Sequence, residues 1–116
     1  LADYPLLHDT DAGNEQPWLD WRGWFERAGL STANVGRGPQ FSDSIVLIGA
    51  AVAGLGIAIG RGPHVAPMLA RGQLVRVTQE SWKSPWRYWL TAPAAHFRRP
   101  VVRIFVDWAL EEARQP

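Results

Sequence analysis

The chain has 116 residues, 47% of them hydrophobic, and carries 12 Lys and Arg against 11 Asp and Glu, a formal net charge of +1 at pH 7. This length suits one domain or part of one, and the near-neutral charge argues against direct nucleic-acid binding by this segment. The absence of cysteine excludes disulfides and cysteine-based metal sites, and fits a reducing compartment. The longest apolar run is too short to span a bilayer, and the first residues lack the basic start of a signal peptide.

The first forty residues predict a strand, a turn, a helix and an irregular strand. Residues 1–8 contain a short apolar run that favours a strand, and residues 9–14 have turn chemistry. Residues 15–28 place aromatic side chains at helical spacing, so we predict a helix there, which Gly29 ends in a Schellman turn. The glycines and the proline between residues 31 and 40 predict an irregular edge strand.

The central stretch predicts a capped, buried helix that is followed by a buried strand. Residues 42–44 carry side-chain oxygens that can accept hydrogen bonds from the first N–H groups of a helix. Residues 45–53 are apolar on every side, which indicates a helix buried on several faces. Gly54 ends this helix, and the short apolar run over residues 55–59 is typical of a buried strand.

The last part of the chain predicts two more helices and two more strands. We expect a short helix over residues 64–70, an alternating strand over 73–78, another strand over 86–91 and an amphipathic helix over 100–113. The resulting order, β-α-β-α-β-(α)-β-β-α, indicates an α/β fold with helices on both faces of a sheet.

The sequence shows no constellation typical of a catalytic or metal site. The three histidines, His8, His64 and His96, are far apart and lack partners at metal-ligand spacing. The glycines of the central stretch follow a helix and precede a strand, whereas a dinucleotide fingerprint needs the opposite order. Ser44 lacks the sequence context of an activated nucleophile. We therefore expect no catalytic residue, no metal and no cofactor.

Polar residues that could bind a small molecule follow the first strand, precede the central helix and lie on the last strand. Helix N-termini favour anions, but Asp43 would weaken that preference unless it faces an ammonium group, so a zwitterion such as an amino acid or a peptide would suit the site. The alternative is that these residues only form caps and turns. The candidate ligand-binding residues are His8, Asp9, Thr10, Ser42, Asp43, Ser44 and Tyr88.

Several stretches together resemble the effector-binding domain of LysR-type transcriptional regulators. The matching segments are YPLLHD, PWLDWRGWFERAGL, FSDSIVLIGAAVAGLGIAIGR, LARGQLVRV, RYWLTAP and PVVRIFVDWALEEA. They run nearly end to end in the family's order, and they look most similar to the branch that holds the glycine-cleavage activator and the β-lactamase regulator.

The resemblance implies an α/β fold like that of the type 2 periplasmic binding proteins, in which an effector lies between two lobes joined by crossover strands. Residues 1–116 would be a partial effector-binding domain, with 10–80 as the second lobe and 84–116 as the return crossover strand and C-terminal helix of the first lobe. Ser44 and Tyr88 would contact the effector. One side of a two-fold dimer would be formed by Trp18, Trp21, Arg22, Phe25 and Val35.

The resemblance thus implies the effector-sensing part of a bacterial, cytoplasmic transcription regulator rather than an enzyme. Its partners would be a small-molecule effector, further copies of the chain in a homodimer or higher homo-oligomer, and DNA through an N-terminal domain that this chain lacks; no membrane partner is expected. The alternative is a solute-binding protein of a transporter with the same fold. The apolar face expected on residues 100–113 predicts that the 116-residue chain self-associates.

Overall fold

The computed structural model describes residues 4–10, 20–85 and 87–114. Within the chain, two units can be distinguished, Leu1–Trp82 and Lys83–Pro116. Trp18 and Trp86, which the sequence analysis assigns to a helix and a strand, lie outside the described residues. All the candidate ligand-binding residues except Tyr88 belong to the first unit.

The first unit contains a sheet of two short parallel strands, with a third segment bridged beside it. β1 (His8–Asp9) pairs in parallel with β2 (Gln40–Phe41). Two residues before β1, Leu6 forms a parallel bridge with Ile57, and the N–H of Leu7 donates to the Ile57 carbonyl at 2.8 Å. The N–H of His8, in contrast, donates to the carbonyl of Pro39, the residue before β2, at 2.9 Å. The β1 segment is therefore central, with β2 and the Ile57 segment as its two neighbours.

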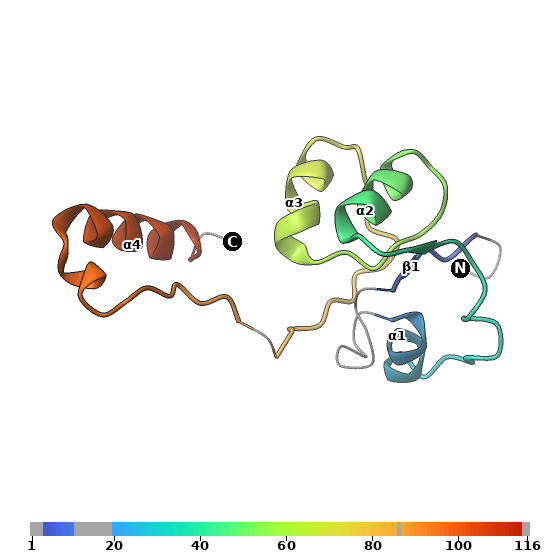
Figure 1. Cartoon of the computed structure of the whole chain (residues 1–116). Helices are drawn as coiled ribbons and strands as arrows, with labels where there is room; N and C mark the ends of the chain where they lie inside the picture. The colour runs from blue at the N-terminus through green and yellow to red at the C-terminus, as the bar shows by residue number, and fades with distance from the viewer. Residues whose placement is uncertain (1–3, 11–19, 86, 115–116) are drawn as a thin grey trace. The chain divides into compact units, whose positions relative to one another are not determined.

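Helices cover both faces of this sheet (Figure 1). Because successive side chains of a strand point to opposite faces, Leu6 and Leu7 face different layers. Leu6 packs with Trp21 of α1 (Trp21–Arg27). Leu7 packs with three buried residues of α2 (Ser44–Val52), and α3 (Gly62–Ala70) adds partly buried side chains to the same cluster. The predicted mixed α/β architecture is confirmed.

The predicted glycine turns are present at the ends of α1 and α2. After α1, Gly29 has a φ of 68° and its N–H donates to the Glu26 carbonyl, while the N–H of Leu30 donates to the Phe25 carbonyl at 2.8 Å. Gly54, with a φ of 78°, and the residue after it make the same pair of bonds behind α2. Both pairs are Schellman motifs, in which glycine takes a left-handed conformation that is strained for other residues.

Several predicted elements of the first unit are shorter than expected or do not form. The described part of the first helix begins only at Trp21, because Asp20 caps it by accepting the N–H of Gly23 at 2.6 Å. The strand expected over residues 31–40 is reduced to β2, behind a turn at residues 33–36, and that over 55–59 is a single bridge at Ile57. Residues 73–78 form no strand, because no neighbouring strand among the described residues supplies the ladder of hydrogen bonds that strand structure needs.

The described residues of the second unit contain η2 (His96–Arg98), which is a short 3₁₀ helix, and α4 (Pro100–Glu112) (Figure 1). α4 confirms the predicted helix over residues 100–113. The described residues of the predicted strand over 86–91 form no strand, again without a ladder partner in the part of the chain that the structure describes. In the described parts of the chain, helices long and apolar enough to cross a membrane are absent.

Candidate functional site

The candidate site lies where β1 and β2 end and α2 begins. The two strands are parallel, with Asp9 in register with Phe41, so their carboxyl ends meet at one edge of the sheet. In open α/β sheets, ligands bind outside the carboxyl ends of the strands. Thr10 follows β1 at this edge, and Ser42 and Asp43 follow β2, so the topology brings together the two polar groups that the sequence separates by more than thirty residues.

A hydrogen bond between side chains joins the two groups. The hydroxyl of Ser44, the first residue of α2, donates to Oδ2 of Asp9 at 2.6 Å. This distance is typical of a charge-assisted bond from a hydroxyl to a carboxylate. Both side chains are half-buried, so solvent weakens this bond less than it would weaken one on the open surface.

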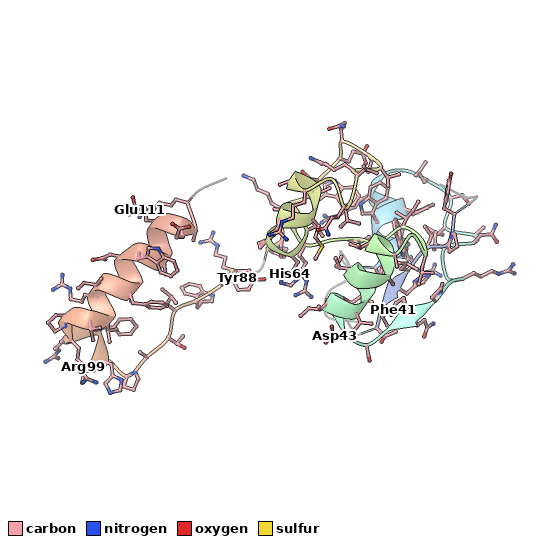
Figure 2. All side chains as sticks on the ribbon, turned by 90° about the horizontal axis from the view of Figure 1, so that it is seen from above. Phe41, Asp43, His64, Tyr88, Arg99 and Glu111 are labelled. Carbon is pink, nitrogen blue, oxygen red and sulfur yellow. The ribbon has the colours of Figure 1, made fainter. Side chains whose placement is uncertain are left out.

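Asp43 is the N-cap of α2, and Figure 2 marks it and Phe41 where β2 passes into this helix. One of its carboxylate oxygens, Oδ1, accepts the N–H of Ile45 at 2.7 Å and the N–H of Val46 at 3.0 Å. Helix N-termini attract anions mainly through such N–H groups. Because Asp43 already engages two of them, an anionic ligand would have to compete with a carboxylate of the chain itself.

His8, Thr10 and Ser42 surround this centre. Thr10 ties the two strands together, since its N–H and its hydroxyl both donate to the Phe41 carbonyl, at 2.8 Å and 3.0 Å. The half-buried His8 ring has Nε2 3.4 Å from the carbonyl oxygen of Arg37. Ser42 is exposed beside Asp43. These residues shape the edge of the sheet around Asp9 and Ser44.

The arrangement offers hydrogen-bond acceptors to a ligand. The proton of the Ser44 hydroxyl is directed to Asp9, so the lone pairs of its oxygen remain to accept. The carboxylate oxygens of Asp9 and Asp43 also accept hydrogen bonds. Groups that donate hydrogen bonds, such as an ammonium group, match these acceptors.

Arg61 is a site candidate that the sequence analysis missed. Ile57 runs parallel to Leu6, so residues after it continue toward the same edge of the sheet at which Asp9 lies. Arg61 follows this segment, is half-buried and is the N-cap residue of α3. The signal was available, because Arg61 is a charged residue close behind the strand predicted over residues 55–59, but the adjoining glycine and proline favoured a plain turn.

The other predicted site residues lie elsewhere. Tyr88 belongs to the second unit, where its side chain is 81% exposed. Of the predicted dimer residues, Trp21 and Val35 are buried in the same cluster as Leu6, Phe25 packs against that cluster, and Arg22 is exposed on α1. The roles of these residues in effector binding and in dimerisation stay predictions. Among the described residues, no group of three or more His, Cys, Asp or Glu side chains could hold a metal ion.

Comparisons with known proteins agree on one family. A family described as LysR substrate binding domain matches residues 1–114. The glycine cleavage system transcriptional activator of Escherichia coli (strain K12) is 27% identical over 113 residues, which cover 97% of this chain and 35% of that protein. The HTH-type transcriptional activator AmpR of Rhodobacter capsulatus is 30% identical over 108 residues, 89% of this chain and 37% of that protein. The chain thus spans about a third of the length of these relatives. No solved structure matches the chain significantly.

Proposed function

The chain belongs to the LysR substrate-binding domain family, and from that premise we propose that it is the effector-sensing part of a bacterial transcription regulator that acts in the cytoplasm. The relatives that align with most of this chain are named transcriptional activators. This favours a regulator over an enzyme or a solute-binding protein of a transporter. DNA binding would belong to another part of a longer protein, as the limited coverage of the relatives suggests.

One observation carries the proposed effector site, the 2.6 Å hydrogen bond from Ser44 to Asp9. It joins the first residue of α2 to the end of β1, at the edge of the sheet where ligands bind in α/β folds. The effector is a small zwitterion, such as an amino acid or a short peptide. Its ammonium group meets the acceptors of Asp9 and Ser44, and its carboxylate group meets Arg61.

In the proposed architecture, residues 10–80 are the second lobe of a fold like that of the type 2 periplasmic binding proteins. The boundary between the two units after Trp82 supports this division. Tyr88 approaches the effector from the return crossover, and a homodimer forms through the helix that includes α1. An effector shifts such a regulator only if it binds one arrangement of the lobes and the dimer more tightly than the other.

Ligand screening tests the effector class. The protein as its gene encodes it is screened by thermal shift against the amino acids and a set of dipeptides, and titration calorimetry then gives affinities. For each ligand that binds, we compare the N-acetylated form and the carboxamide form. We expect either change to weaken binding by about tenfold or more, since each removes a charge-assisted hydrogen bond. Full affinity of an N-acetylated ligand would exclude the proposed ammonium contact.

Effector-dependent DNA binding tests the regulator role. The same protein is incubated with fragmented genomic DNA, and the bound fragments are sequenced with and without a ligand from the screen. We expect a small set of enriched fragments whose occupancy changes with the ligand. A protein that enriches no fragment in either condition would not be a transcription regulator.

A further inference from the structure

Trp82, the last residue of the first unit, packs against α1. Its ring centroid lies 4.9 Å from that of Trp24, and Cζ of Arg27 lies 5.5 Å from the Trp82 centroid. Both partners are on α1. At these distances, both an aromatic contact and a cation–π contact are favourable.

Trp82 stands out in its segment by its side-chain packing, although the Arg76 side chain also donates to the Gln79 and Glu80 carbonyls. Among the described residues from 79 to 96, Trp82 is the one whose side chain is not exposed. The boundary between the two units also falls directly after it. Its contacts with α1 are therefore the last side-chain packing of the first unit before the chain leaves it.

The same helix also holds β1. The indole N–H of Trp21 donates to the Leu7 carbonyl at 2.9 Å in a buried bond, and the rings of Trp21 and Trp24 are 6.1 Å apart, edge to face. Leu7 precedes Asp9 by two residues. A continuous series of contacts thus leads from Trp82 through Trp24 and Trp21 to the strand that carries Asp9.

We propose that Trp21, Trp24, Arg27 and Trp82 form a latch, called here the α1 latch, that couples the exit point of the chain to the position of β1. While it is closed, the exit point and Asp9 are held by one helix. When Trp82 leaves α1, Trp24 and Arg27 lose their contacts with its ring. The hydrogen bond from the Trp21 indole to the Leu7 carbonyl then becomes easier to break. The latch provides a discrete element by which a movement of the following unit reaches the candidate site.

Hydrogen–deuterium exchange tests the latch without any effector, so its outcome is independent of the proposed function. In the protein as encoded, we follow the peptide of residues 4–10, whose amides at Leu7, His8 and Thr10 bond to neighbouring segments. Trp82→Ala should raise its exchange rate about tenfold, and Arg27→Met should raise it about two- to fivefold. Peptides from α2 and α3 should keep their wild-type rates.

Two substitutions serve as controls. Trp89→Ala removes an exposed tryptophan of the second unit, and Glu26→Met removes an exposed charged side chain from α1 itself. Both should leave the exchange of residues 4–10 unchanged. The latch is wrong if Trp82→Ala leaves this peptide at its wild-type rate, or if it raises the exchange of all peptides equally. If Trp82→Ala does not fold, Arg27→Met against Glu26→Met decides, because both side chains are exposed on α1 and it is Arg27 that contacts the Trp82 ring.

Discussion

Leu6 and Leu7 are neighbours in the chain, yet they belong to two different hydrophobic clusters on opposite faces of the sheet. Leu6 packs with Trp21 and Val35, whereas Leu7 packs with Leu47, Ile48 and Ala50. This pair joins the layer of α1 to the layer of α2 and α3 through one short strand. The strand that carries Asp9 is therefore fixed from both faces.

We predict that Leu7→Ala destabilises the protein by about 2–5 kcal/mol, since it removes a fully buried side chain and leaves a cavity between β1 and α2. Val75→Ala, at an 81% exposed position, is the matched control and should change the free energy of unfolding by less than about 0.5 kcal/mol. Urea unfolding measures both. Equal effects of the two substitutions would contradict the core position of Leu7.

Two glycines near the end of α2 should respond in opposite directions to the same substitution. Gly49 is exposed inside the helix and a Cβ there meets nothing, so Gly49→Ala should stabilise the protein by about 0.5–1 kcal/mol. Gly54 also has open space, but its φ is 78°, so Gly54→Ala should destabilise by about 1–2 kcal/mol through backbone strain. Thermal unfolding of the pair checks this, and a loss of stability in Gly49→Ala would contradict the helix position.

The N-cap of α2 can be tested without removing a polar group from the core. Asp43→Ala should cost about 0.5–2 kcal/mol, because the N–H groups of Ile45 and Val46 lose their acceptor. Asp43→Ser should restore most of the stability, since a hydroxyl can also cap. If both variants are equally unstable in urea, the capping role is wrong and the charge of Asp43 is what matters.

The sequence patterns predicted α2 and α4 closely, because cap residues, apolar spacing and glycine or proline signals act within a few residues of the chain. The strands were predicted less well, since a strand is defined by its neighbours and not by its own residues. Residues 73–78 alternate as a strand should, but no partner lies beside them among the described residues. The sequence also did not predict that residues 36–40 pass close to the β1 segment. In the structure, a Cβ on Gly38 would overlap the Leu6 carbonyl.

Most residues of the candidate site could be predicted from the sequence, but the contact between them could not. Asp9 and Ser44 could be named from the sequence as a residue after a strand and a residue at a helix start, but their hydrogen bond joins positions 35 apart. Such a contact follows from the parallel register of β1 and β2, which no local pattern fixes. The aromatic spacing around Trp21 left a core position and a subunit contact open, because it marks an apolar face and not what covers it; in the structure Trp21 is buried with Leu6.

The last prediction concerns the two serines beside Asp43, which have the same chemistry and different positions. Ser44 is half-buried and donates to Asp9, whereas Ser42 is exposed. We predict that Ser44→Ala weakens the binding of an ammonium-bearing effector by about tenfold or more, because the hydroxyl that orients the Asp9 carboxylate and accepts from the ligand is lost. Ser42→Ala is the control and should keep the wild-type affinity in calorimetry.

Measuring the free energy of unfolding of the Ser44 variants distinguishes an effect on binding from an effect on folding. Ser44→Ala removes one hydrogen bond to a half-buried carboxylate, so we expect it to lower the free energy of unfolding by about 1–3 kcal/mol. Ser44→Thr keeps the hydroxyl, and should recover most of this stability and, if the effector fits beside the added methyl group, much of the affinity. Equal affinities in Ser44→Ala and Ser42→Ala would show that the Asp9–Ser44 pair only joins α2 to β1. The effector would then have to bind through other residues at the edge of the sheet.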